Sequence, residues 1–166
     1  ELVLTGYLRG AFPMCDPESG RVEWFTCDPR ALVPLDDRFR VSKSLARVVR
    51  GGRFEVRVDT VFAEVMRACA APRDDATGTW ISTEMVSAYT QLHQAGYAHS
   101  VETWHNGELV GGLYGIRMGG AFFGESMFSD ARDGSKIALA WLVAYEAFGW
   151  WDSPPLTAAL IIGLLV

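Results

Sequence analysis

The amino-acid sequence predicts an α+β fold, in which helices pack on a mostly antiparallel sheet. The first indication is an alternation of short helical and strand-like patterns in the N-terminal 96 residues. The second is a run of three strand-like segments joined by tight turns, and the third is a long apolar-rich helical pattern after them. A meander followed by a helix of this length can bury one hydrophobic core.

The elements before residue 58 are short. Residues 1–10 resemble the end of a helix, broken at Gly10, and residues 22–25 predict a strand followed by the turn Asp28-Pro29-Arg30. Ser42 is a suitable N-cap for a helix that ends at Gly51-Gly52. This helix would place Leu45, Val48 and Val49 on one face. Residues 54–58 alternate between apolar and charged side chains, as on a half-buried strand.

Two helices are expected next. Asp59 is a candidate N-cap for the first, whose apolar positions are Phe62, Val65, Met66 and Cys69. Ser82 or Thr83 opens the second, which ends near Gly96. Its inward positions are Met85, Ala88, Tyr89 and Leu92. Both helices therefore have one apolar stripe to bury.

The expected strands of the meander are 98–104, 108–117 and 121–128. Asn106-Gly107 is a strong hairpin signal, because both central residues of a type I′ turn have positive φ. Gly119-Gly120 provides the second turn, and a helix over 135–148 ends at Gly149. The order predicts antiparallel neighbours throughout the meander.

Composition narrows the class of protein. The chain has 166 residues, of which 49% are hydrophobic, so it can form one ordinary domain and is neither disordered nor a coiled coil. No apolar run reaches the length of a membrane span, and the sequence shows no signal-peptide pattern. Because it lacks an initiator Met, we expect it to be a fragment. Three cysteines without CxxC spacing predict reduced thiols in the cytoplasm, and the three histidines lack zinc-site spacing.

Charge is concentrated in one segment. The net charge is −5, yet residues 38–57 contain seven basic residues and one acid, a local charge of +6 on a body of −11. One interpretation is a solvated helix face. The other is a patch that binds phosphate groups of a nucleic acid.

The strand at 121–128 carries an unusual carboxylate. Glu125 lies within Phe122-Phe123-Gly124-Glu125-Ser126-Met127-Phe128-Ser129, and strand alternation puts it on one face with Phe123 and Met127, beside the long helix. A buried carboxylate must be paired or belong to a site. Glu125 is therefore either a structural partner of an arginine or amide, or the anionic group of an apolar pocket for a cationic ligand.

Two further residues have open interpretations. His99 is either a satisfied histidine near the start of a strand or a group with catalytic or pH-dependent work. Trp80, in the loop Gly78-Thr79-Trp80-Ile81, is either a lid on the core or a platform that stacks on a nucleobase.

Taken together, these motifs resemble the leucyl/phenylalanyl-tRNA–protein transferase family. The matching segments are collinear and cover roughly residues 5–149. They are YLRGAFP (7–13), VEWFTCDPR (22–30), VSKSL (41–45), GTWI (78–81), HSVETW (99–104), LVGGLYG (109–115), FFGESMFS (122–129) and Ser135-Lys136. GESMFS, GTWI and HSVE are specific in combination, whereas each alone is a weak signal.

The resemblance implies an acetyltransferase-like (GNAT) fold for residues 59–166, with residues 1–58 as a small N-terminal portion that carries the basic patch. It also implies transfer of leucine or phenylalanine from aminoacyl-tRNA to the N-terminal Arg or Lys of a protein, which marks that protein for degradation. The expected enzyme is a cytoplasmic monomer that needs no metal, cofactor or membrane, because the aminoacyl ester is already activated. Aminolysis of the ester requires proton removal, an oxyanion donor and positioning.

The family's site residues carry over by position. Trp80 matches the residue beside the terminal adenosine of the tRNA, and Tyr89 and Trp24 match binding-site residues, although Phe25 stands where the family has a second Trp. The pocket for the aminoacyl side chain and amine corresponds to Gly124, Glu125, Met127 and Ser129. The tRNA-facing basic region corresponds to Lys43, Arg47, Arg50 and Arg53.

The C-terminal part departs from the family. Asp152 is the only candidate for the Asp of the family's proton relay, whereas Pro154 and Ala159 replace its Gln and His. Proline has no side-chain polar group and no N–H, so it cannot replace a hydrogen-bonding Gln. We therefore expect weak or absent transfer, with the aminoacyl pocket retained. The alternatives are a non-catalytic relative that binds aminoacyl-tRNA or N-terminal peptides, and an acyltransferase with a small-molecule donor.

Overall fold

The computed structural model describes residues 2–34, 38–72, 78–148 and 159–162. The helices are α1 (Leu2–Leu8), α2 (Lys43–Arg50), α3 (Phe62–Cys69), α4 (Thr83–Gln94) and α5 (Gly134–Phe148). The strands are β1 (Ala11–Cys15), β2 (Val22–Thr26), β3 (Ala31–Pro34), β4 (Glu55–Val58), β5 (Ala98–His105), β6 (Glu108–Met118), β7 (Ala121–Ser129) and β8 (Ala159–Ile162). None of the described helices is long and apolar enough to cross a membrane.

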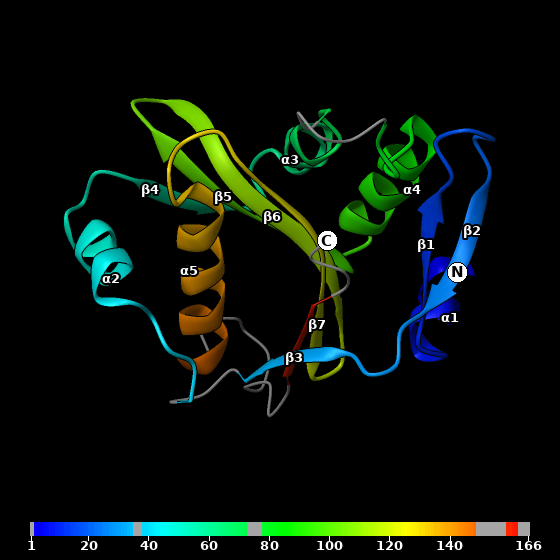
Figure 1. Ribbon diagram of the computed structural model, residues 1–166, viewed down its shortest axis with the longest axis horizontal. Helices are drawn as coiled ribbons and strands as arrows, with labels where there is room; N and C mark the ends of the chain where they lie inside the picture. The colour runs from blue at the N-terminus through cyan, green and yellow to red at the C-terminus, as the bar shows by residue number, and fades with distance from the viewer. Residues whose placement is uncertain (1, 35–37, 73–77, 149–158, 163–166) are drawn as a thin grey trace.

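The strands form two sheets, which confirms the α+β class. A six-stranded sheet has the order β3-β8-β7-β6-β5-β4, and its neighbours are antiparallel except for the parallel pair β7 and β8. The hairpin of β1 and β2 is a separate sheet beside α1 (Figure 1). Because β3 and β4 join the large sheet, two strands from residues 1–58 pair with strands from the remainder of the chain. The division at residue 58 stays a prediction.

The meander forms as the sequence predicts. Asn106 and Gly107 have φ of 54° and 82°, the positive values that a type I′ turn requires, and Gly119 has φ of 54° in the second turn. Residue Gly96, after α4, also has positive φ, at 79°. These turns leave β5, β6 and β7 as consecutive antiparallel neighbours.

Helices cover both faces of the large sheet (Figure 1). On one face, α5 contributes Ala138, Leu142 and Val143 to a buried cluster with Val101, Leu113 and Phe122. On the opposite face, α3 and α4 bury the predicted residues of their apolar stripes, including Val65, Met66, Met85 and Tyr89. The α1–β1 region adds Tyr7, Phe12 and Cys15 to this second cluster. The sheet is thus a layer between two apolar cores.

Strands β1 and β3 are absent from the sequence prediction. Each contains a proline, Pro13 or Pro34, which weakens a strand assignment because it cannot donate to a ladder. Both prolines lie in strands of four or five residues, where the alternation is too short to reveal the strand. β1 is defined by its hairpin with β2, and β3 by its pairing with β8, which is distant in sequence.

Helix starts show one wrong prediction. Ser42 and Ser82 cap α2 and α4 as expected, each accepting the N–H of the residue three positions later. Asp59 does not cap α3. Instead, Asp59 has φ of 58° and accepts hydrogen bonds from β5, whereas the N–H groups of Thr60 and Val61 donate to Glu102 of β5. A carboxylate from the neighbouring strand therefore replaces the local cap.

Candidate functional site

Glu125 lies at a bulge in β7. Residue Tyr114 of β6 pairs with Ser126, and the next residue, Gly115, pairs with Gly124, so Glu125 is the extra residue in the ladder. A bulge of this kind re-aims the inserted side chain and shifts the alternation of the strand on either side of it. The strand's facing pattern therefore changes at Glu125.

The bulge corrects the predicted facing of this strand. Phe123 packs on the α3–α4 side, whereas Met127 packs against the α5 cluster, so the two lie on opposite faces. Strand alternation predicts that Phe123, Glu125 and Met127 share one face of the sheet, beside the long helix. This prediction is wrong. Glu125 points away from α5, toward the tyrosines of the other face.

The carboxyl group of Glu125 is buried among phenols. Its residue is 4% exposed, and its side chain hydrogen-bonds with Tyr7 of α1. The hydroxyl of Tyr7 also lies 2.7 Å from that of Tyr89 on α4, forming a chain of three polar groups. Burial raises the pKa of Glu125 to about 7, although the Tyr7 hydrogen bond and the positive charge of Arg30 act in the opposite direction. Near neutral pH, this carboxyl group is poised between its two protonation states.

The surrounding phenols keep their protons. Burial raises the pKa of Tyr7, Tyr89 and Tyr114 well above the ordinary value, and the negative charge of Glu125 raises them further. They are therefore hydrogen-bond donors at any physiological pH. Tyr7, Tyr114 and Arg30 are missing from the predicted site residues, because none shows in a local pattern that it will lie beside Glu125.

The two tryptophans among the predicted site residues, Trp24 and Trp80, border the strand β1. Trp24 pairs with Pro13 across the β1–β2 hairpin, is 40% exposed, and packs its ring on Gly6 of α1, where an added Cβ would lie 2.1 Å away. Trp80 is half-buried against the α3–α4 core, and its carbonyl accepts the N–H of Cys15 at 2.9 Å. The Trp24 ring thus lies beside the residue that precedes Tyr7, and the Trp80 backbone is hydrogen-bonded to the end of β1.

The remaining pocket candidates are spread along β7. Gly124 directly precedes the bulge, and Met127 lies on the α5 side. Ser129 is exposed at the strand's end, where its hydroxyl donates to the carbonyl of Ala131 and accepts the N–H of Ser135. Ser129 therefore organises the turn into α5, and four residues of strand, roughly 13 Å, separate it from Glu125.

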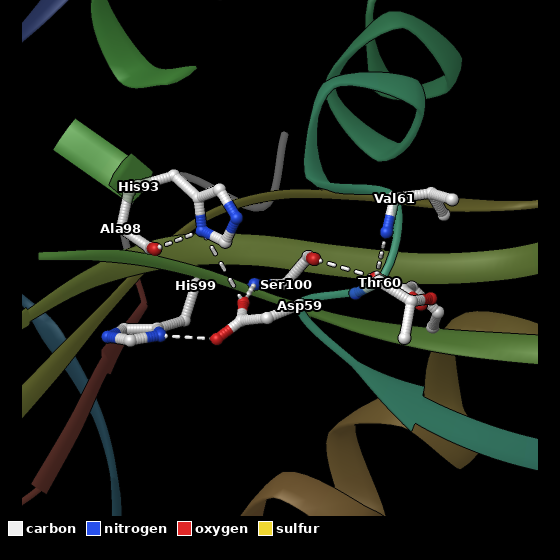
Figure 2. A network of polar contacts seen from close by, with 8 residues as sticks. Asp59, Thr60, Val61, His93, Ala98, His99 and Ser100 are labelled. Carbon is white, nitrogen blue, oxygen red and sulfur yellow. Dashed lines mark hydrogen bonds and ion pairs between the residues drawn. The ribbon is translucent and has the colours of Figure 1, made fainter. Parts of the chain in front are cut away.

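His99 is a histidine with a carboxylate partner. Its Nδ1 lies 2.7 Å from Oδ2 of Asp59, whose Oδ1 accepts the N–H of Ser100 at 2.8 Å (Figure 2). Nδ1 of His93 donates to the carbonyl of Ala98 at 2.9 Å and lies 3.7 Å from Oδ1 of the same aspartate. These contacts favour the simpler of the two interpretations, a histidine satisfied within the fold.

The predicted basic residues gather on one helix face. Lys43, Arg47 and Arg50 are exposed at positions i, i+4 and i+7 of α2, and they line a surface hollow of about 670 Å³. We call Lys43, Arg47, Arg50 and Arg53 the α2 basic surface. Arg53 extends it toward the β5–β6 hairpin, where its Nε donates to His105 at 3.2 Å.

Arg57 differs from this group. Both its Nε and Nη2 donate to Glu55, at 2.8 and 2.9 Å, and its guanidinium lies 4.3 Å from the centre of the Trp104 ring. A neutralised and stacked arginine contributes little to a phosphate-binding field. The surface that can attract phosphate groups therefore contains fewer basic residues than the segment 38–57.

Comparison with known proteins decides the family. The model of the family described as leucyl/phenylalanyl-tRNA protein transferase matches residues 32–155. A protein of that name from Chlorobaculum parvum is 55% identical over 147 residues, which cover 87% of this chain and 74% of the relative. The chain belongs to the leucyl/phenylalanyl-tRNA protein transferase family. Relatives of the same name from Herpetosiphon aurantiacus and Akkermansia muciniphila are 54% and 52% identical, and the matches cover 72% and 75% of their lengths.

The C-terminal departures lie mostly beyond the structural description. Asp152 and Pro154 are outside the described residues, and Ala159 is the first residue of β8. Within the described ranges, no group of three or more His, Cys, Asp or Glu side chains could hold a metal ion. The candidate residues in the described ranges fall into separate groups: the buried phenol–carboxylate chain, the two tryptophans near β1, and the α2 basic surface, which lies at the opposite end of the molecule from β1 (Figure 1).

Proposed function

We propose that this chain transfers leucine or phenylalanine from aminoacyl-tRNA to the N-terminal Arg or Lys of a protein, marking that protein for degradation. The observation that carries the proposal is Glu125, an anionic group buried in an apolar, phenol-lined site of a chain that belongs to this family. An aminoacyl ester presents an α-ammonium group beside an apolar side chain. A buried carboxylate next to apolar surface has the chemistry to recognise that pair.

In the proposed reaction, the α-amine of the acceptor protein attacks the ester carbonyl of the aminoacyl-tRNA. A new amide bond forms, the bond to the ribose oxygen breaks, and the amine proton passes to that leaving oxygen. Glu125 would hold the donor's ammonium group, with Tyr7 of α1 donating to the carboxylate and Tyr89 of α4 hydrogen-bonding to Tyr7. Such positioning of both reactants supplies much of the rate enhancement in transfers between activated substrates.

The remaining assignments follow the same proposal. Trp80 would contact the terminal nucleoside, and Trp24 and Tyr89 would line the binding site. Gly124 would allow close approach, and Met127 and Ser129 would bound the side-chain pocket. The fold would be acetyltransferase-like over residues 59–166, which the meander and the parallel β7–β8 pair support. The three cysteines are not joined in disulfides, which agrees with action in the cytoplasm, and the chain would act as a monomer without a cofactor.

The activity itself is tested with a peptide that begins with arginine. We expect transfer of phenylalanine from phenylalanyl-tRNA to this peptide, slowly because Pro154 cannot make a glutamine's hydrogen bonds, and faster in the Pro154→Gln variant. A peptide with a blocked N-terminus is the control and should remain unmodified. Tight binding of phenylalanyl-tRNA without transfer by either protein would favour the non-catalytic relative instead.

The α2 basic surface is proposed to bind tRNA phosphates. Replacing Arg47 or Arg50 by Glu should weaken tRNA binding roughly tenfold at low salt and reduce the slope of log affinity against log salt by about one. Filter binding over a salt series measures both quantities. The matched control is Arg132→Glu, since the Arg132 side chain is 97% exposed between β7 and α5. An equal loss in all three variants would show a general charge effect and contradict this surface.

A further inference from the structure

Tyr114 has a buried hydroxyl group that the fold does not use. The residue lies on β6 with 0% exposure, and its ring packs edge-to-face against Phe62 and Tyr89, with centroid distances of 6.0 and 5.8 Å. Its hydroxyl oxygen has no hydrogen-bond partner among the described residues. A buried polar group without a partner destabilises the folded state, because it loses its hydrogen bonds to water. A phenylalanine would make the same ring contacts without that penalty.

The unused hydroxyl lies near Glu125. Tyr114 pairs with Ser126, the residue that follows the bulge, and it shares the face of the sheet toward which Glu125 points. The charge of Glu125 acts directly on the Tyr114 phenol and raises its pKa, after the larger effect of burial. An ionised carboxylate offers about four lone-pair sites, so the hydrogen bond from Tyr7 leaves room for further donors.

None of the other groups described around Glu125 supplies a second hydrogen bond to its carboxylate. Tyr89 on α4 reaches Tyr7, 2.7 Å away. Arg30 attracts the carboxylate, but its Nη2 donates to the carbonyl of Gly10 at 2.7 Å and its guanidinium lies over the Phe12 ring. Cys69 on α3 is the further titratable group that acts on Tyr114. Within the described residues, Tyr114 is therefore the buried donor with spare capacity on this face.

We infer that Tyr114 is a positioning residue whose hydroxyl donates to Glu125 when this carboxylate is ionised opposite a bound ammonium group. The inference rests on the proposed function, because the ammonium group is that of the aminoacyl ester. When Glu125 is neutral, its hydrogen bond with Tyr7 is sufficient and the Tyr114 hydroxyl makes no hydrogen bond. When an ammonium group arrives, Glu125 becomes an anion in apolar surroundings, and donors from α1 and β6 together stabilise it.

The test is Tyr114→Phe in the full chain, with the Glu125 carboxyl carbon followed by NMR as the pH is changed. We expect the titration midpoint of Glu125 to rise by about one pH unit, a tenfold change in its ionisation constant. At pH 7, affinity for phenylalanyl-tRNA should fall several-fold, while affinity for N-acetyl-phenylalanyl-tRNA, which lacks the ammonium group, stays unchanged. Stability to urea should be equal or higher, because an unsatisfied hydroxyl has been removed.

Two variants serve as comparisons. Tyr7→Phe removes a hydroxyl that already has partners, so it should raise the midpoint and also lower stability. Tyr97→Phe removes a hydroxyl from a tyrosine that is 43% exposed and should change neither quantity. An unchanged midpoint in Tyr114→Phe, or a loss of stability as large as that of Tyr7→Phe, would overturn the inference. A raised midpoint without any preference of the wild-type protein for charged tRNA would support the contact and contradict the proposed function.

Discussion

Replacing Glu125 by Gln is expected to abolish most aminoacyl transfer while making the protein more stable at alkaline pH. The variant keeps the size of the side chain and an oxygen that can accept from Tyr7, but it cannot neutralise an ammonium group. We expect transfer from phenylalanyl-tRNA to fall by about a hundredfold or more, the scale seen when one charge-stabilising group is lost from a preorganised site. Single-turnover transfer to an N-terminal-arginine peptide measures this loss.

The stability gain follows from the raised pKa of the buried carboxyl group. Glu125 has a folded-state pKa of about 7 against an ordinary value of 4.5, so folding favours its protonated form. Below pH 4.5 both states are protonated and burial carries no ionic penalty. As pH rises from 4.5 to 7 the penalty of burying the charge appears, and it reaches about 3 kcal/mol above pH 7. Gln has no charge to bury, so this contribution to the pH dependence disappears.

Urea unfolding at pH 5 and pH 8 measures the penalty of burying the charge of Glu125. Wild type and Glu125→Gln should differ little at pH 5 and by up to about 3 kcal/mol at pH 8, with the variant more stable. Glu108→Gln, at an exposed position in the β5–β6 hairpin, removes the same charge and should leave the difference near zero. If the Gln variant were less stable than wild type at pH 8, Glu125 would be a structural ion rather than a strained functional one.

The sequence predicts the meander well because local chemistry determines it. Asn106-Gly107 and Gly119 require the turns that form, and the apolar spacing in α3 and α4 selects the buried faces without reference to distant residues. The candidate Glu125 is also identifiable, since a carboxylate among large apolar side chains needs an explanation. Local sequence patterns therefore predict single helices, strands and turns, but not the contacts between them.

The surroundings of Glu125 could not be predicted in the same way. One inserted residue in the β6–β7 ladder reverses the facing of Met127 relative to Phe123, and no residue type marks that insertion. Tyr7 and Tyr89 are 82 positions apart, and only tertiary packing brings their hydroxyls to 2.7 Å. Tertiary packing also explains why Glu102, and not Asp59, accepts the hydrogen bonds at the start of α3. Glu102 lies on a neighbouring strand, so local sequence does not reveal it.

Glu102 is expected to be the most sensitive position for folding outside the Glu125 site. It is 0% exposed, and each carboxylate oxygen accepts several hydrogen bonds. Oε1 accepts from the N–H groups of Thr60 and Val61, at 2.9 and 3.0 Å, and from the Ser100 hydroxyl at 2.9 Å. Oε2 accepts from the Thr60 hydroxyl and from Nε1 of Trp104. One side chain thus satisfies donors from the start of α3 and from β5.

Replacing Glu102 by Ala leaves all of these donors without their acceptor. Because the donors at the start of α3 include two backbone N–H groups, we expect a loss of about 3–5 kcal/mol in the free energy of unfolding. For a chain of this size, that corresponds to a fall of roughly 10 °C in the midpoint of thermal unfolding. Urea unfolding and calorimetry measure the two quantities.

Glu55→Ala is the matched comparison, since Glu55 lies on the adjacent strand β4 and its carboxylate accepts hydrogen bonds from Arg57. Its contact with Arg57 is exposed, so its loss should change stability by less than about 1 kcal/mol. Glu102→Gln should fall between the two alanine variants, because one amide oxygen can still accept from Thr60 and Val61, whereas the amide nitrogen would face Nε1 of Trp104, which can only donate. Equal stability of Glu102→Ala and Glu55→Ala would mean that water or α3 itself satisfies these donors, and that Glu102 is not what fixes the start of the helix.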